Sequence, residues 1–358
     1  MADPPLLPSV RGRGAASNPS NRFERLHVEL DPDDEQFERP AYRPRTQFFV
    51  DHSRSILARN DSPDIPYRHS INAYRGCEHG CIYCYARPTH EYLGFSIGLD
   101  FESKIMVKLG AAGLLQRELS RRGWVPQPIA MSGVTDIYQP AEKHFRLTRS
   151  LLEVLLDFRN PVTLITKNAL ILRDLDLLTE LARRRLVNVA LSVTTLQEDL
   201  RRRMEPRTST AERRLDAVAR LAEAGVPVGV MMGPVIPGLT DVEIPAVVRA
   251  AADAGASWTG YNVVHFPHGT AGLFMDWLDR EYPEARARVE SRIREVRGGA
   301  LIDSRFGTRM TGEGPYAEQI RALFRSACRK HGLPKARGRL DVTHFRVPSL
   351  QPSLFDRD

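Results

Sequence analysis

RGCEHGCIYCY, residues 75–85, places three of the four cysteines of this chain in one short loop. Cys77, Cys81 and Cys84 have the spacing C-x3-C-x2-C. Three thiolates can hold three irons of a [4Fe-4S] cluster, and the fourth iron is then left without a protein ligand. Such an open iron can bind a substrate or cofactor directly. The two glycines of the stretch suit a loop wrapped closely round a cluster, because a Cβ atom would restrict its backbone.

Two other uses of the cysteines stay open from the residues alone. A structural zinc site would need a fourth ligand such as His79, His90 or Cys328, although zinc modules usually offer paired ligands at two spaced sites. A disulfide fits poorly, because three crowded thiols do not make a simple pair and a clustered set is typical of a reducing compartment. The spacing therefore favours an iron–sulfur cluster.

The composition is that of a globular protein. Of the 358 residues, 42% are hydrophobic and 27% are charged. No apolar run approaches the roughly 18 residues of a membrane span, and the first residues lack the pattern of a secretory signal. We therefore expect a cytoplasmic protein with no membrane partner. The net charge of +7 is compatible with DNA as a partner, although arginine runs such as 183–185 are explained equally by solvated helix faces.

Six strand-and-helix units are predicted between residues 65 and 264. The expected strands are 70–73, 128–132, 162–166, 187–193, 226–232 and 258–264, and the expected helices are 111–122, 146–158, 174–184 (capped by Asp174), 210–224 and 241–254. Strands joined in this way form a parallel sheet with right-handed crossovers. We predict an α/β fold, a partial (β/α)6 TIM-type barrel open on one side. The cysteine loop would follow its first strand, at the carboxyl ends where barrels carry their chemistry.

The rest of the chain divides by composition. Residues 1–62 are rich in Pro, Arg, Gly and Ser and are expected to form a largely disordered N-terminal arm. Residues 63–300 form the core domain, with a helical stretch at 273–295. Residues 301–335 are a C-terminal helical extension, and 336–358 are a flexible tail.

The cysteine spacing resembles that of the radical S-adenosylmethionine (SAM) superfamily. The resemblance implies a [4Fe-4S] cluster on Cys77, Cys81 and Cys84, which are then both metal ligands and catalytic residues. The open iron would be chelated by the amino and carboxylate groups of SAM. An electron from a donor such as flavodoxin or ferredoxin would split SAM into methionine and a 5′-deoxyadenosyl radical. Tyr83, just before the third cysteine, would lie near the adenine.

Polar residues directly after the predicted strands are candidates for the SAM contacts. The turn at Ser132 and Gly133 offers backbone groups for the SAM ammonium, and Lys167 offers a cation for its carboxylate. Ser192 and Thr194 can bond the ribose hydroxyls. Each residue alone would also fit a helix cap or a polar edge of the core. Lys167 is the strongest candidate, because a lysine directly after an apolar strand is poorly placed for a core.

Further motifs resemble the spore photoproduct lyase branch of the superfamily, and within it an uncharacterised bacterial subgroup. They are the segments 132–142, 166–167, 192–195, 204–207 and 234–239. The resemblance covers about residues 65–300 and extends into both tails. One feature departs from the branch: Met131 stands where spore photoproduct lyase has its hydrogen-donating cysteine. Tyr138, Tyr261 or another aromatic residue could donate the hydrogen atom instead, and the sequence singles out none of them.

The end of the chain resembles the pentapeptide by which bacterial DNA polymerases and repair proteins dock on the sliding clamp. Gln351 is followed by the pair Leu354 and Phe355, and Pro352 departs from the more usual leucine. An exposed Leu-Phe pair in a polar tail calls for an apolar pocket on a partner. A tail folded back on the barrel is the alternative.

These features together predict a lyase-like radical SAM enzyme that abstracts hydrogen from a large substrate, a DNA lesion or other nucleic acid. Two alternatives remain. The same chemistry would act on RNA, a peptide or a small molecule, or the chain would be a non-enzymatic, clamp- or DNA-associated module with a structural iron–sulfur or zinc site.

Overall fold

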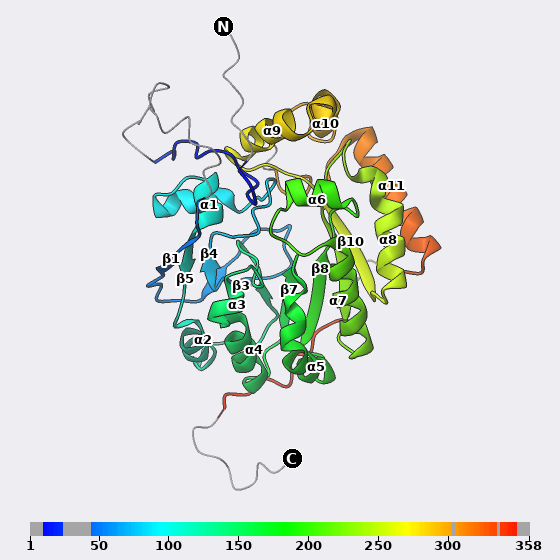
Figure 1. The fold of residues 1–358 in the computed structure, drawn as a ribbon. Coiled ribbons are helices and arrows are strands. Elements are labelled where there is room, and N and C mark those ends of the chain that lie inside the picture. The colour runs from blue at the N-terminus through cyan, green and yellow to red at the C-terminus, as the bar shows by residue number, and fades with distance from the viewer. Residues whose placement is uncertain (1–9, 24–43, 303–304, 335–336, 349–358) are drawn as a thin grey trace.

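The computed structural model describes residues 10–23, 44–302, 305–334 and 337–348. Its centre is a seven-stranded sheet in the order β10-β9-β8-β7-β6-β3-β2 (Figure 1). Six strands are parallel, and the edge strand β2 (Leu57–Arg59) is antiparallel to its neighbour. The parallel strands are β3 (His69–Ile71), β6 (Ile129–Met131), β7 (Val162–Thr166), β8 (Val187–Ser192), β9 (Val228–Val235) and β10 (Trp258–Val263).

The sheet winds in one direction, because each parallel strand lies beside the next one along the chain. Within the described ranges the edge strands β10 and β2 do not pair with each other, so the barrel is open. The six units and the open α/β barrel predicted from the sequence are thereby confirmed.

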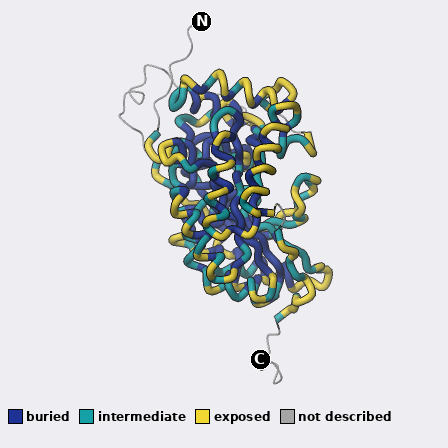
Figure 2. The backbone as a smooth tube through the Cα atoms, turned by 90° about the vertical axis from the view of Figure 1, so that its right-hand side faces the viewer, coloured by how far each residue is buried: buried dark blue, intermediate teal, exposed yellow. Residues whose placement is uncertain are grey.

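Helices between the strands cover the outer face of the sheet, except α6, which lies at the carboxyl end of the strands (Figure 1). They are α2 (Ala111–Leu119), α3 (Glu142–Phe145), α4 (Leu147–Asp157), α5 (Leu175–Arg183), α6 (Glu198–Met204), α7 (Ala211–Glu223) and α8 (Ile244–Asp253), with 3-10 turns η3 (Ala169–Asp174) and η4 (Asp241–Glu243). Figure 2 shows the buried residues running through the middle of the molecule and the exposed ones on its outer helices. None of the described helices is long and apolar enough to cross a membrane.

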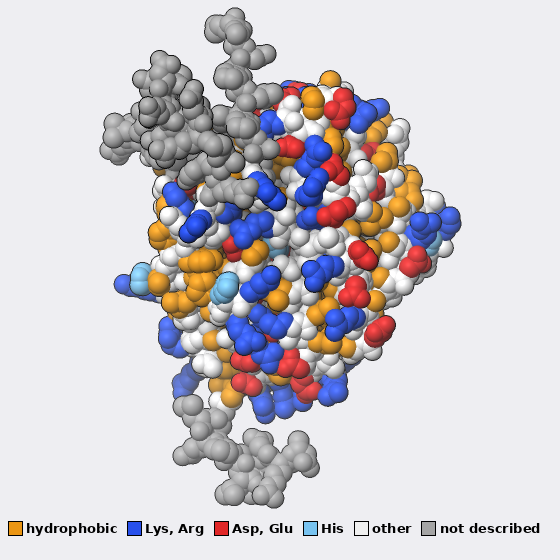
Figure 3. Space-filling model, viewed as in Figure 1, with side chains coloured by type: hydrophobic (Ala, Val, Ile, Leu, Met, Phe, Trp, Pro, Cys, Tyr) orange, Lys and Arg blue, Asp and Glu red, His pale blue; other side chains and the backbone are white. Residues whose placement is uncertain are grey.

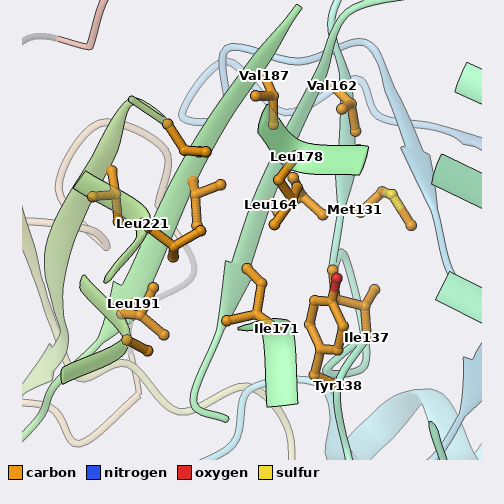
Figure 4. Packing of buried hydrophobic residues seen from close by; sticks show 14 of the residues in the cluster. Met131, Ile137, Tyr138, Val162, Leu164, Ile171, Leu178, Val187, Leu191 and Leu221 are labelled. Carbon is orange, nitrogen blue, oxygen red and sulfur yellow. The ribbon is translucent and has the colours of Figure 1, made fainter. Parts of the chain in front are cut away.

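The core lies between the sheet and these helices. Leu164 and Leu191 of the strands pack with Leu178 and Leu221 of the helices, and all four are buried (Figure 4). Each fully buried side chain of this size contributes about 1.5–3 kcal/mol relative to an exposed one. The amphipathic helices and apolar strands of the sequence therefore meet in one hydrophobic layer.

Asp174 differs from its predicted role as a helix cap. It stands at the N-cap of α5, but its carboxylate makes no capping bond. The side chain is fully buried and accepts from Arg173 at 2.7 Å and from the Tyr138 hydroxyl at 3.1 Å. A buried carboxylate is stabilised more by a guanidinium than by one backbone amide, which explains the difference.

Two segments after β10 extend the core. The predicted helical stretch 273–295 is two helices, α9 (Thr270–Glu281) and α10 (Arg286–Glu295), separated by the turn η5 (Pro283–Ala285). Pro283 cannot donate a helical hydrogen bond, which accounts for the break. Helix α11 (Gly314–Lys330) packs on α8, and its Phe324 is fully buried.

A second, three-stranded sheet was not expected from the sequence. It has the order β1-β5-β4, where β1 is Gln47–Val50, β5 is Lys104–Val107 and β4 is Tyr74–Arg75. The short helices η2 (Arg87–Leu93) and α1 (Leu99–Ser103) adjoin it. Strand β4 leads directly into the cysteine loop. Residues 44–62, predicted to belong to a largely disordered arm, thus supply β1 and β2, because long-range strand pairing overrides their polar composition.

The described end of the chain also differs from the predicted flexible tail. Residues 333–334 and 337–348, here called the C-terminal strap, run beneath the amino ends of the strands. The Thr259 amide donates to the Pro334 carbonyl at 3.1 Å, and Arg185 pairs with Asp341 at 2.7 Å. Phe345 packs on Phe158 of the α4 end, with ring centroids 6.2 Å apart. Gln351, Leu354 and Phe355 lie outside the described residues.

Candidate active site

The cysteine loop is held in a tight path at the carboxyl end of the sheet. Cys77 and Cys81 are buried, and Cys84 is half-buried. The Cys77 amide donates to the Phe101 carbonyl at 2.9 Å. Gly76 has φ +80°, and a Cβ atom there would lie 2.9 Å from both the Phe101 oxygen and the His90 ring. Only glycine fits that position without strain.

A buried ion pair fixes the loop from behind. Arg87 and Glu102 are both fully buried, with nitrogen and oxygen 2.5 Å apart. Arg87 also donates to the Cys81 carbonyl at 2.9 Å. The Glu102 carboxylate accepts from the backbone amides of Gly14 at 3.0 Å and Ala15 at 2.9 Å. Residues 10–23 of the predicted disordered arm are therefore part of the support for the cysteine loop.

The segment 132–142 has a holding role that its sequence did not reveal. The Thr135 hydroxyl donates to the Gly76 carbonyl at 2.7 Å, and Gln139 accepts from the Glu78 amide at 2.9 Å. Asp136 pairs with His79 of the loop at 3.3 Å. Burial of Asp136 acts to raise the pKa of its carboxyl. The neighbouring His79 and the hydrogen bonds that the carboxylate accepts outweigh burial, so the pKa of Asp136 is lowered. This segment thus positions the cysteines, and its first residues, among them Ser132, Thr135 and Asp136, also line the cavity beside them.

An open cavity of about 180 Å³ joins the cysteine loop to the strand ends. Its walls include all three cysteines together with Tyr83, Tyr85, Ser132, Lys167, Ser192, Gly233, Asn262 and His265. Gly133 and Thr194 are not part of the wall. The Gly133 carbonyl accepts from the Tyr85 hydroxyl at 2.7 Å, and Thr194 is fully buried behind Lys167.

Lys167 reaches across the strand ends to the neighbouring units. Its ammonium donates to the Ser192 hydroxyl at 2.6 Å, the Thr194 hydroxyl at 3.2 Å and the Gly233 carbonyl at 2.8 Å. These three acceptors occupy all three protons of the ammonium. A ligand carboxylate at Lys167 therefore has to replace one of them, and the neutral hydroxyls are the weaker partners.

Glu205 completes this network and was not singled out from the sequence. It is fully buried, lies 3.3 Å from the Lys167 ammonium and 2.6 Å from Arg214, and accepts from the Tyr83 hydroxyl. Burial alone would raise the pKa of Glu205, but Arg214 and Lys167 outweigh burial and keep it well below the ordinary range. Glu205 belongs to the segment 204–207, whose resemblance to the branch was the only sequence signal for it.

The three thiols fit a cluster better than a single metal ion. Burial raises the pKa of Cys77, Cys81 and Cys84, while Lys167 and Arg87 act in the opposite direction at the last of these. Across the described part of the chain, no three His, Cys, Asp or Glu side chains converge as ligands of one ion. His90 faces the Lys104 carbonyl, and Cys328 lies on α11, so neither completes a zinc site. Three thiols along one wall of a cavity suit a cubane, whose irons take separate ligands.

Comparison with known families identifies this chain. The family described as the radical SAM superfamily matches residues 71–251. The chain belongs to the radical SAM superfamily. It is therefore an enzyme that uses a [4Fe-4S] cluster and SAM.

Relatives in other organisms are similar over most of the core. An uncharacterised protein of Mycobacterium tuberculosis is 38% identical over 234 residues, which are 65% of this chain and 68% of that protein. An uncharacterised protein of Methanocaldococcus jannaschii is 30% identical over 219 residues, covering 61% and 78%. A solved structure of spore photoproduct lyase complexed with dinucleoside spore photoproduct has TM-score 0.55 at 17% identity, over 79% of each chain. That likeness is one of fold.

The hydrogen donors suggested by the sequence are not at the cavity. The Tyr138 hydroxyl is bonded to Asp174 within the core, and the Tyr261 ring packs at a tilt against Phe324 of α11, with centroids 4.6 Å apart. Met131 is buried beneath the strand ends. The tyrosines that line the cavity are Tyr83 and Tyr85, on either side of the third cysteine.

Proposed function

We propose that this radical SAM enzyme abstracts a hydrogen atom from a nucleic-acid substrate, most simply a damaged base in DNA. The cluster and SAM, when bound, supply a one-electron cleavage that generates a radical able to remove hydrogen. The observation that carries the proposal is an aromatic platform at the mouth of the cavity. Tyr85 is 49% exposed, and its ring stacks on His265 with centroids 5.7 Å apart and 22° between the planes.

This platform has the chemistry that recognises a base. The bond from the Tyr85 hydroxyl to the Gly133 carbonyl fixes its ring. Burial, together with nearby arginines, lowers the pKa of His265 to about 4, so the second ring is neutral at pH 7. Stacking a base on an aromatic side chain is worth about 1–3 kcal/mol, and it does not depend on sequence. The solved spore photoproduct lyase of the same fold holds a dinucleoside photoproduct, which supports a substrate of this class.

The reaction of spore photoproduct lyase itself is not what we assign. By its motif resemblance to that branch, this chain has Met131 where the hydrogen-donating cysteine is expected, and Cys328 lies on α11 away from the cavity. Within the cavity we propose Lys167, Ser192, Ser132 and Tyr83 as SAM contacts, with Thr194 supporting Lys167 and Gly133 supporting Tyr85.

Release of 5′-deoxyadenosine by the reconstituted, dithionite-reduced enzyme tests the substrate class. We expect ultraviolet-irradiated single-stranded DNA to stimulate release about tenfold or more over no substrate, and His265→Ala to remove most of the stimulation. His268→Ala, an exposed histidine three residues away, is the matched control. Stimulation by RNA alone would move the substrate to RNA. No stimulation by either nucleic acid would refute the proposal.

We also infer a cytoplasmic enzyme that is brought to DNA through the sliding clamp. Three clustered free cysteines and a reduced cluster suit a reducing compartment. Gln351, Leu354 and Phe355 form the sequence motif that supports clamp binding. The net charge of +7 supports association with a polyanion.

A further inference from the structure

The side of the molecule that carries the β1-β5-β4 sheet and η2 has an exposed aromatic surface. We call Phe23, Phe49, Tyr92 and Phe95 the aromatic face. Phe49 is 38% exposed and Tyr92 70%. Phe49 packs on Phe95 at 5.9 Å, and Phe23 on Tyr92 at 5.4 Å. All four residues of the edge strand β1 are exposed, and Figure 3 shows hydrophobic side chains gathered on this side with basic ones beside them.

The ion pairs around the aromatic face expose their positive members to solvent and bury their carboxylates. Three ion pairs border it: Arg22 with Glu91, Arg75 with Asp51, and Lys104 with Asp100, at 2.9–3.0 Å. In each pair the cation is 32–38% exposed and the carboxylate only 2–13%. Two of the cations also lie over rings of the face, Lys104 over Phe95 at 4.8 Å and Arg22 over Tyr92 at 5.4 Å. A partner therefore meets apolar rings and positive charge.

The aromatic face is connected to the cysteine loop by packed rings. Phe95 lies 5.3 Å from the His90 ring, which lies 5.5 Å from Phe101. Phe101 packs with Cys77 in one buried cluster. Burial lowers the pKa of His90 to about 4, so this path contains no charge at neutral pH. A molecule docked on the face is separated from the cluster loop only by closely packed side chains.

We propose that the aromatic face is the docking site of an acidic, one-electron carrier protein that reduces the cluster. In this step the carrier gives up one electron and is oxidised, the cluster gains that electron, and no bond is made or broken. Negative charge on the carrier would be steered by the outward cations, and its apolar contact would rest on the rings. The proposal depends on the need of the cluster for an external electron and not on the identity of the substrate.

Direct binding tests the docking site without using activity. The probe is a bacterial flavodoxin in its oxidised form, titrated anaerobically into the reconstituted full-length protein by calorimetry at low and high salt. We expect binding that weakens with salt, and a loss of about tenfold in affinity for Lys104→Glu and for Tyr92→Ser. Arg183→Glu reverses an arginine of α5 that is 72% exposed and also ion-paired, and it should bind like the wild type. The Tyr92 side chain is mostly in solvent, so Tyr92→Ser should fold normally. It therefore tests the docking site even if Lys104→Glu misfolds.

A second measurement compares two reductants. The rate of cluster reduction by reduced flavodoxin, divided by the rate with dithionite, should fall in Lys104→Glu and Tyr92→Ser but not in Arg183→Glu. Three results overturn the proposal: no flavodoxin binding by the wild type at low salt, equal binding by wild type and both face variants, or variants that lose affinity for single-stranded DNA and keep that for flavodoxin. The last would make the face a nucleic-acid surface.

Discussion

The two ends of the parallel sheet are stabilised in different ways. At the carboxyl end, Lys167, Glu205 and Arg214 form a buried charged network. At the amino end, the C-terminal strap is joined by the Arg185–Asp341 ion pair, whose arginine is 74% exposed, and by neutral contacts such as the bond from the Asn188 side-chain amide to the Gly338 carbonyl at 2.8 Å and the packing of Phe345. Burying ions costs more desolvation than burying apolar groups, so a charged network is a poor way to gain stability alone. We propose from this contrast that the charged network at the carboxyl end serves ligand binding, and the predictions below test it.

The largest expected effect is loss of the cluster at the carboxyl end. Cys81→Ala removes one of three iron ligands, and we expect no [4Fe-4S]⁺ signal in electron paramagnetic resonance and SAM cleavage at background. The wild-type signal should change when SAM is added. Cys328→Ala, a change of the same type on α11, should leave both properties intact. A Cys81→Ala protein with a SAM-responsive cluster would show that the cysteine loop is not the site.

Breaking the charged network should cost more than breaking a neutral contact at the other end. Glu205→Gln leaves Lys167 and Arg214 buried without their carboxylate, and we expect a loss of about 3–5 kcal/mol in unfolding free energy together with weaker SAM binding. Asn188→Ala should cost about 1 kcal/mol and leave SAM binding unchanged. Denaturant unfolding and SAM titration measure the two quantities. Equal effects of the two variants on SAM binding would erase the distinction between the ends.

We expect the C-terminal strap to contribute to the stability of the fold and to have no effect on SAM cleavage. Phe345→Ala removes a half-buried ring from Phe158, and we expect about 1–2 kcal/mol of lost stability, below the 3–5 kcal/mol of a fully buried phenylalanine. SAM cleavage per cluster should stay at the wild-type rate. A fall in that rate, measured at a temperature where the variant is folded, would mean that the amino end also acts on the site.

The smallest expected effect on the enzyme itself is at the clamp motif. The double change Leu354→Ala and Phe355→Ala should leave stability and SAM cleavage unaltered and abolish retention on an immobilised sliding clamp. Retention of the double variant would remove the clamp proposal. Gln351→Ala should give an intermediate loss, because only its polar contact is removed.

The sequence was most informative about features that depend on residues close together in the chain. Apolar strands such as 162–166 and helices with a single apolar face predict the open barrel, and the spacing of Cys77, Cys81 and Cys84 predicts the cluster loop. Lys167 followed from its place after a strand. The support of the site did not follow, because it depends on contacts between distant residues: Tyr83 and Glu205 are 122 positions apart, and Ala15 and Glu102 are 87 apart. No local pattern records such pairs.

The N-terminal arm and the tail are a second case in which contacts between distant residues could not be predicted from the sequence. Their polar composition predicts disorder, yet β1 gains its structure from pairing with β5, and the strap from bonds to β10 and α4. Composition indicates only how much apolar surface a segment can bury by itself. These two segments are stabilised instead by contacts with the rest of the fold, which their own composition does not record.

The strap has a mechanical consequence for an open barrel. A closed barrel resists splaying through a continuous ring of hydrogen bonds, but here β10 and β2 leave that ring unfinished. The strap contacts β10, β8 and the end of α4, and its Arg337 lies over Trp258 at 4.4 Å while donating to the Tyr67 hydroxyl at 2.7 Å. It therefore joins β10 to Tyr67, just before β3, at the amino end of the sheet, and we expect any widening of the open barrel to be smaller there than at the carboxyl end, where the cavity lies.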